Sequence, residues 1–330
     1  PPPAARFMPR LDFCCFGKGE TKPMKSFLKR LAGTIPVLLG VVLLIFIMLR
    51  IIPGNAAVVL MGEHIDPETV ARLTANMGLD DPLFVQFFRY IANALRGDLG
   101  ISYRYDRPVA AMIAEAFPYT LQLALLAALF AWALGLAAGV AAAIRKDRLL
   151  DRLFMGVSLL GVSMPVFMTS LLLQYFFGFV LKWFPLTAED GGLAAMVLPA
   201  IALGWNSAGS IARMTRSSLI EVMQADYIDT ARAKGLGRGA VILGHALKNS
   251  MLPVITMMAL QLSSMLSGAV ITESIFAIPG IGRLATNAIN GRDMPVLQGT
   301  VLFTTVLVIA GNLLADLLYS VLDPRIRKEV

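Results

Sequence analysis

The side chains of this sequence that could carry out chemistry form no catalytic or metal-binding pattern. The two histidines, His64 and His245, have no partner ligands at metal spacing, and the two cysteines, Cys14 and Cys15, are adjacent. An adjacent pair predicts neither a disulfide framework nor a thiolate metal site. No Gly-x-x-x-x-Gly-Lys-Ser/Thr loop is present to hold the phosphates of ATP. The sequence therefore predicts no catalytic residue, no metal and no cofactor bound by this chain itself.

One polar segment does have a well-defined local pattern. Asp226 can cap a helix that begins at Tyr227, and Asp229 stands at the third helical position, where it completes a capping-box geometry. Gly235 can supply the left-handed conformation that ends a helix. The sequence predicts one short, stiff helix here. Its apolar edge consists of Tyr227, Ile228 and Ala231, and is small and flat enough to sit in the cleft of another protein.

The composition indicates the surroundings of this segment. Of the 330 residues, 57% are hydrophobic and only 15% are charged, whereas soluble domains carry about a quarter charged residues. The mean hydropathy is +0.70. Such a chain cannot build an ordinary aqueous surface, which excludes a cytosolic enzyme, a disordered regulator and a nucleic-acid-binding module in spite of the pI of about 9.6. The sequence predicts an all-α integral membrane protein.

Six runs are long and apolar enough to cross a bilayer, which takes about 20 residues as a helix. Each predicts one helix, because only helices and closed barrels satisfy their backbone in lipid. The runs are 31–49, 116–144, 153–181, 191–212, 249–272 and 294–315, the last continuing past Asp316 to Leu322.

Lys and Arg residues set the expected orientation. Most of the 29 lie in the leader, in the loops after the second and fourth runs, and at the end of the chain. The positive-inside rule then places both termini in the cytoplasm. Residues 1–23 are expected to be a leader, a tag or a disordered tail, and residues 24–330 a single six-span domain.

Two loops are longer than simple connections. The external loop, 50–115, has the start and end signals of two surface helices. One would begin at Asp66-Pro67 and end at Gly78, and the other would begin at Asp81-Pro82 and end at Gly97. They could lie on the membrane or form a lid or docking surface for an external partner. The cytoplasmic loop, 213–250, contains the short helix described above.

The segment Asp229-Thr-Ala-Arg-Ala-Lys-Gly235 resembles the Glu-Ala-Ala-x-x-x-Gly loop of permease subunits in bacterial binding-protein-dependent ABC importers. Ala231 and Gly235 match that pattern, while Asp229 replaces Glu and Thr230 replaces Ala. Further stretches resemble the peptide and nickel branch of this family in the same order along the chain. They are Gly97-Asp-Leu-Gly-Ile-Ser102, Pro118-Tyr-Thr-Leu, Glu273-Ser-Ile-Phe-Ala-Ile-Pro-Gly-Ile-Gly-Arg-Leu284, Arg292-Asp-Met-Pro295 and Asp323-Pro-Arg325.

The resemblance implies a bacterial inner-membrane permease with a coupling helix that docks into a groove on a cytoplasmic ATPase. It also implies a second, related permease, two ATPase subunits that hold ATP and Mg, and an external substrate-binding protein. No nucleic acid is expected. The residues that would contact the ATPase are Asp226, Tyr227, Ile228, Asp229, Ala231, Arg232, Gly235 and Leu236.

Two further groups of residues are candidates for transport roles. Polar residues in the apolar runs, together with the helix-kinking Pro165, could line a path or a gate, although packing and hydrogen bonding between helices explain them equally well. This first group is Ser163, Met164, Pro165, Gln174, Asn206, Gln261, Ser264 and Asp316. Candidates for contact with the external binding protein are Asp98, Glu273, Arg283, Arg292 and Asp293.

The sequence thus favours half of the membrane pathway of an ABC importer for peptides. An importer of nickel or of another small solute on the same scaffold is an open alternative, because no residue in the apolar runs identifies the substrate. An ion-coupled carrier would need ionisable groups at depth, and the first five runs contain none. An intramembrane hydrolase would need a Ser-Lys pair, a pair of Asp residues or a His-Glu-x-x-His motif within the spans, and the apolar runs contain none of these. A passive scaffold would differ from the importer subunit in having no stably bound ATPase.

Overall fold

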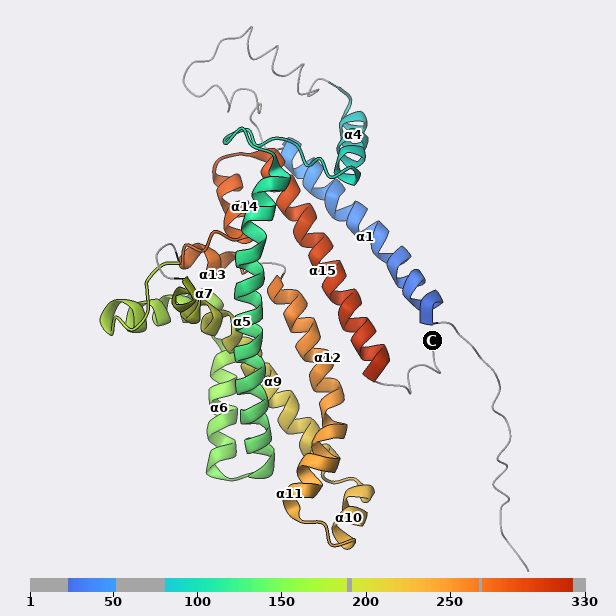
Figure 1. Ribbon diagram of the computed structural model, residues 1–330, viewed down its shortest axis with the longest axis vertical. Helices are drawn as coiled ribbons and strands as arrows, with labels where there is room; N and C mark the ends of the chain where they lie inside the picture. The colour runs from blue at the N-terminus through green and yellow to red at the C-terminus, as the bar shows by residue number, and fades with distance from the viewer. Residues whose placement is uncertain (1–22, 52–80, 189–191, 267–268, 323–330) are drawn as a thin grey trace, which may run out of the picture.

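The computed structural model describes residues 23–51, 81–188, 192–266 and 269–322 (Figure 1). In these ranges the chain is helical, and one isolated antiparallel bridge joins Ile101 and Pro108. The helices are α1 (Pro23–Ile51), α4 (Leu83–Leu95), α5 (Val109–Ile144), α6 (Leu149–Ser163), α7 (Val166–Leu173), the π-helical η1 (Gln174–Val180), α8 (Gly192–Ala195), α9 (Val197–Val222), α10 (Asp226–Ala233), α11 (Arg238–Ala240), the π-helical η2 (Val241–Ala246), α12 (Leu247–Leu266), α13 (Val270–Ile275), α14 (Ile281–Asn290) and α15 (Met294–Leu322).

Four helical stretches of the described chain are long and apolar enough to cross a membrane, namely 109–144, 192–222, 238–266 and 294–315. A fifth is formed if α6 and the helix that follows it count as one broken span. In α1 the apolar stretch that can be assessed is Gly33–Met48. The all-α membrane fold expected from the sequence is therefore confirmed at the level of four to five apolar helices.

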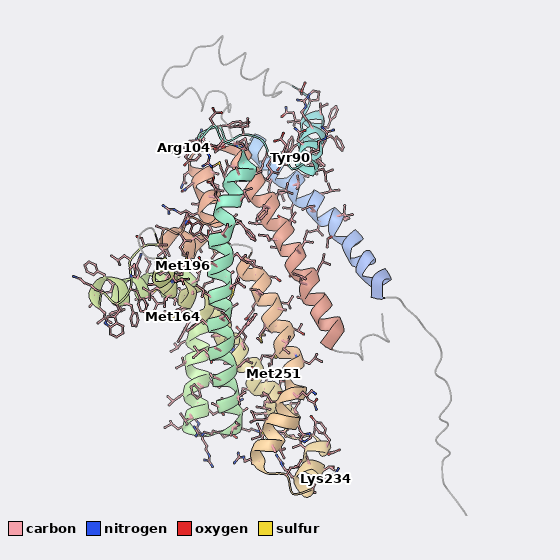
Figure 2. The ribbon with its side chains drawn as sticks, in the orientation of Figure 1. Tyr90, Arg104, Met164, Met196, Lys234 and Met251 are labelled. Carbon is pink, nitrogen blue, oxygen red and sulfur yellow. The ribbon has the colours of Figure 1, made fainter. Side chains whose placement is uncertain are left out.

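The third predicted span is not one helix. α6 ends at Ser163, Met164 is extended, and α7 starts at Val166 at an angle of 106°. Pro165 is the cause, because it has no amide hydrogen and its ring disfavours helical geometry in the preceding residue. The predicted kink is therefore a complete break, at the point labelled Met164 in Figure 2.

Two other predicted spans have different ends. α9 continues to Val222 instead of stopping near residue 212, so part of the expected cytoplasmic loop is helical. The fifth span, expected to run to residue 272, is interrupted, since α12 ends at Leu266 and α13 is a separate short helix. The first expected surface helix, at 66–78, lies outside the described residues.

Helices α5 and α9 form the centre of the bundle, and small residues let them approach closely. A Cβ added at Gly139 would overlap the Ala212 carbonyl of α9, and one added at Gly204 would overlap the Ala127 carbonyl of α5. Small residues at an interface permit such backbone contact between membrane helices. α5 also runs between the two ends of the molecule, with α10 and α11 at one end and α4 and α14 at the other (Figure 1).

The second expected surface helix is present as α4. Its C-terminal Gly97 has φ of +83°, and the amides of Gly97 and Asp98 donate to the carbonyls of Ala94 and Asn93. This pair of hydrogen bonds is the Schellman arrangement. At the other end, Asp81 forms an ion pair of 2.7 Å with Arg89. The predicted end of this helix at Gly97 is therefore confirmed, but its predicted start is wrong, because Pro82 occupies the N-cap position and no side chain caps the helix.

Candidate functional site

The short helix predicted in the cytoplasmic loop is α10, but it does not begin as expected. Ala225 occupies the N-cap position with extended backbone, Asp226 is the first helical residue, and no side chain caps the helix. The predicted capping by Asp226 and the capping box with Asp229 are therefore wrong. Asp229 pairs instead with Arg232, at 2.9 Å. Both carboxylates still lie in the first turn, where the helix dipole favours negative charge.

The C-terminal end of α10 is as predicted. Gly235 has φ of +82°, which is the left-handed conformation that glycine adopts without a steric cost. The amide of Gly235 donates to the Arg232 carbonyl, and the amide of Leu236 donates to the Ala231 carbonyl. These are again the two bonds of a Schellman motif, so α10 and α4 end in the same way.

One side of α10 is covered by the chain itself. Ile228 is fully buried and Ala231 is buried, in a cluster with Leu219 of α9, Ala143 of α5 and Val241 of η2. The predicted apolar edge therefore does not face another protein, because two of its three residues anchor α10 to its own bundle. Burial of an isoleucine side chain contributes about 1.5–3 kcal/mol, which is enough to fix the orientation of so short a helix.

The opposite side of α10 is open. Tyr227 is 44% exposed, and its hydroxyl accepts a hydrogen bond of 2.9 Å from the Asn249 amide. Lys234, at the C-cap, lies at the end of the molecule remote from Arg104 (Figure 2). The accessible residues of this face, called here the outward face of α10, are Asp226, Tyr227, Asp229, Thr230, Arg232, Ala233, Lys234 and Leu236.

An ion pair between the buried Asp151 and the half-buried Arg216 was not predicted from the sequence. Asp151, in the first turn of α6, accepts hydrogen bonds of 2.6 and 2.7 Å from Arg216 of α9, and it also accepts the backbone amide of Asp147. A bidentate pair of this kind fixes geometry as well as charge. The signal in the sequence was only a carboxylate at the start of an apolar run, because its arginine partner is 65 residues away.

Two of the residues predicted to line a path or gate, Asn206 and Gln174, link separate segments of the chain. The Asn206 amide of α9 donates to the Val162 carbonyl at the end of α6, at 3.2 Å. The Gln174 amide donates to the carbonyls of Leu186 and Ile275, at 2.9 and 3.3 Å.

The remaining members of this predicted group are dispersed. Ser163, Pro165 and Ser264 are exposed, Met164 is half-buried, and the Gln261 side-chain oxygen is buried with no partner in the described structure. Asp316 lies in α15, and its side chain is outside the described residues. None of the group lines the open cavities that the described chain forms beside α11 and beside α14.

Glu273 is not the surface carboxylate expected from the sequence. It is fully buried in α13 and accepts hydrogen bonds from the Thr120 hydroxyl of α5, at 2.8 Å, and from the Arg283 amide of α14, at 3.0 Å. Thr120 also accepts the Ile281 amide, at 2.9 Å. The carboxylate thus lies at the positive N-terminal end of α14, and a side chain at Gly280 would overlap it. These contacts, called here the outer clamp because the sequence predicts this end to be external, tie α13, α14 and α5 together.

Asp293 is also buried, contrary to the expectation of an exposed contact. Its carboxylate accepts the Ser102 hydroxyl at 2.5 Å and the amides of Tyr103 and Arg104 at 3.1 and 3.3 Å. It therefore holds the segment before α5 against the start of α15. Sequence alone could not have found this, because the two sides of the contact are about 190 residues apart.

The other three expected contact residues remain accessible to different degrees. Asp98 and Arg292 are exposed, and Arg283 is half-buried with its guanidinium donating to the Ala277 carbonyl at 2.5 Å. Next to the outer clamp is an open cavity of about 510 Å³. It is lined by Arg107, Met112, Glu115, Ala116, Tyr119, Pro279, Gly280, Arg283, Leu284 and Asn287.

Comparison with known families gives two matches that together span most of the chain. Residues 135–328 match the family described as "Binding-protein-dependent transport system inner membrane component". Residues 24–124 match the family of the N-terminal part of the same membrane components.

Similar proteins of known name are peptide permeases. A putative peptide transport system permease protein of Brucella abortus is 42% identical, over 91% of this chain and 98% of its own length. The dipeptide transport system permease protein DppB of Escherichia coli K12 is 41% identical, over 92% of this chain and 99% of its own length. DppB of Alkalihalophilus pseudofirmus is 39% identical, with coverage of 91% and 98%.

Among solved structures, the inward-facing MetNI methionine ABC transporter has a similar fold. One of its chains aligns with a TM-score of 0.55 and 17% identity, over 64% of this chain and 96% of its own length. At this level of identity the likeness concerns the fold alone.

Proposed function

The chain belongs to the family of binding-protein-dependent transport system inner membrane components, and we infer that it is a permease subunit of an ABC importer of peptides. Relatives about 40% identical over nearly their whole length are peptide and dipeptide permeases. They support the substrate class for this chain, as does the order of the branch motifs along the sequence.

We propose that α10 is the coupling helix of this permease. The observation that carries this proposal is the division of α10 into two faces. Ile228 and Ala231 attach it to the bundle, while the outward face leaves charged and aromatic side chains accessible. A helix that is fixed on one side and open on the other can pass a displacement from a partner protein into the helices that hold it. Such a rigid-body shift is a known kind of transition.

The route of that displacement follows from the contacts of α10. Its inward face packs on α9 and η2, and η2 leads directly into α12. The Ser218 hydroxyl of α9 donates to the Ser250 carbonyl of α12, at 2.9 Å. The Asp151–Arg216 pair links α9 to α6. Movement of α10 would therefore reach the two apolar stretches 192–222 and 238–266 together, as alternating access requires.

We propose a multi-pass arrangement in the bacterial inner membrane with six spans and both termini in the cytoplasm. The four apolar helices, the broken pair of α6 and α7, and α1 support the count. The excess of Lys and Arg beside α10 supports the orientation. A second permease would complete the path, two ATPase subunits would hold ATP and Mg, and a substrate-binding protein would deliver the peptide from outside. This chain would bind no cofactor and catalyse no reaction itself.

Recovery of the ATPase subunits with the tagged permease tests this assignment. Ala233→Arg places a bulky charge on the outward face of α10, and we expect it to reduce ATPase recovery about tenfold, which corresponds to ~1.4 kcal/mol. Ala92→Arg is the matched control, because Ala92 is an exposed alanine of the short helix α4 at the other end of the molecule.

The same preparations are then tested for transport of a labelled dipeptide into proteoliposomes. Uptake should require both the ATPase subunits and ATP. Uptake by the permease alone would exclude the proposed function, and equal ATPase recovery with Ala233→Arg and the wild type would exclude the role of α10.

A further inference from the structure

An open cavity of about 450 Å³ lies beside α11, at the end of the molecule that carries α10. The turn between α5 and α6 forms one side, the end of α9 another, and α11 the third. It is lined by Ala143, Ile144, Arg145, Lys146, Arg148, Ile220, Met223, Gln224 and Arg238. Four of these nine residues are cationic, and none is acidic. Ala143, Ile220 and Met223 also belong to the apolar cluster that holds α10, but the coupling mechanism described above uses none of the four cations.

The positive charge of the cavity is not neutralised within the described structure. Arg238 donates to the Ile144 carbonyl at 3.2 Å, and no carboxylate among the described residues forms an ion pair with any of the four cations. Asp147 belongs to the same turn, but it does not line the cavity. The C-terminal ends of α5 and α9 supply about −0.5 charge each, and Asp147 supplies −1, which leaves a net charge of roughly +2. A cavity with this charge favours an anion.

The surroundings of the cavity indicate the source of the anion. Leu149 follows Arg148 directly and is 72% exposed at the start of α6. Leu153, Val157 and Leu160 continue an exposed apolar stripe along the same helix. A cationic hollow that borders directly on an apolar helix face matches a molecule with an anionic head and hydrocarbon chains. Basic pockets between membrane helices on the cytoplasmic side bind anionic lipid headgroups in this way.

We propose that this cavity binds the phosphodiester headgroup of an anionic phospholipid, with its acyl chains along the exposed face of α6. The inference rests on the proposed function, which places this end of the molecule at the cytoplasmic surface. The bound headgroup would lie between α5, α9 and α11, next to α10. The lipid would therefore stabilise the bundle end to which the coupling helix is attached.

Native mass spectrometry of the full chain in neutral detergent at low salt tests this proposal. We expect phosphatidylglycerol to bind more tightly than phosphatidylcholine. In the triple variant Arg145→Gln, Lys146→Gln, Arg148→Gln, the affinity for phosphatidylglycerol relative to phosphatidylcholine should fall about a hundredfold. Each cation near an anionic surface contributes about fivefold to the affinity, and the three factors multiply. The triple variant Arg96→Gln, Arg104→Gln, Lys182→Gln removes the same charge from exposed positions elsewhere and should keep the preference.

Equal binding of the two lipids to the wild type, or an equal loss in both triple variants, would overturn the proposal. Glycerol 3-phosphate is tested as a further ligand. If it binds as tightly as phosphatidylglycerol, the cavity is a site for a soluble phosphate and the lipid proposal fails. ATPase recovery is measured in parallel. If the cavity variant loses the ATPase but keeps its lipid preference, the cavity is an ATPase contact and the lipid proposal fails. If lipid binding behaves as expected while no ATPase binds any variant, the proposed function fails instead.

Discussion

The two ends of this molecule are held together by opposite means. At the end that carries α10, apolar side chains attach the helix to the bundle, and its charged side chains remain accessible. At the opposite end, which carries α14, the carboxylates of Glu273 and Asp293 are buried, and backbone amides and hydroxyls of distant segments satisfy them. Apolar packing holds α10 firmly and leaves its charged side chains available to a partner, whereas each hydrogen bond to a buried carboxylate requires a defined geometry. The contrast suits the first end to contact a moving partner and the second to hold a shape.

The largest expected effect is at the outer clamp. Glu273→Ala removes a buried acceptor from the Thr120 hydroxyl and the Arg283 amide, and hydrogen bonds to a charged group contribute about 1.5–3 kcal/mol each, so we expect a loss of ~3 kcal/mol or more. Thermal unfolding in detergent measures this loss. Glu115→Ala is the matched control, since its ion pair with Arg107 is exposed and contributes less than ~1 kcal/mol. Equal losses in the two variants would contradict the buried clamp.

The next effect concerns the apolar attachment of α10. Ile228→Ala leaves a cavity in the cluster with Leu219 and Val241, and such truncations cost about 2–4 kcal/mol. Because α10 is short, the cost should appear as local release of the helix, measured by faster hydrogen exchange of its amides and lower ATPase recovery. Ile289→Ala removes the same atoms from a side chain that is 58% exposed. Unchanged exchange in α10 would refute its attachment through Ile228.

A smaller effect separates the two Schellman motifs. Gly235 and Gly97 have nearly the same φ, and a Cβ added at either residue would have no neighbouring atom within 4 Å. Valine at either site should therefore cost about 1–2 kcal/mol through backbone strain alone. Both variants should fray their helix by similar amounts, but only Gly235→Val should weaken ATPase recovery. Similar loss of recovery with Gly97→Val would remove the distinction between the two ends.

The smallest effect is expected at the start of α10. Asp226 makes no capping hydrogen bond, so Asp226→Ala should change stability by less than ~0.5 kcal/mol, as for ordinary surface substitutions. Hydrogen exchange in the first turn measures this. A destabilisation of about 1 kcal/mol or more would restore the capping role that the sequence predicted.

Several features that depend on local chemistry could be predicted from the sequence, but the caps expected at Asp226 and Asp229 were not among them. The left-handed glycines at 97 and 235 and the interruption at Pro165 follow from what those residues can do wherever they occur. Features that depend on distant partners could not. The spacing of Ile228 and Ala231 indicates an apolar edge, but it does not say that Leu219 and Val241 cover it. Glu273 reads as an exposed carboxylate because Thr120, which binds it, lies 153 residues earlier in the chain.

The size of the break at Pro165 is a similar case. Proline predicts a kink, but the 106° angle depends on packing after the break. There the Gln174 amide reaches the carbonyls of Leu186 and Ile275.

The most direct test of the central claim, that α10 receives the work of a separate ATPase, is disulfide cross-linking in the assembled importer. Ala233→Cys is introduced after Cys14 and Cys15 are changed to serine, and single cysteines are placed along the groove of the ATPase. We predict that oxidation joins position 233 to the ATPase and stops ATP-driven peptide uptake, and that reduction restores it. A cysteine at 233 that stays freely reactive toward a maleimide and forms no cross-link, while the complex transports peptide, would contradict the account.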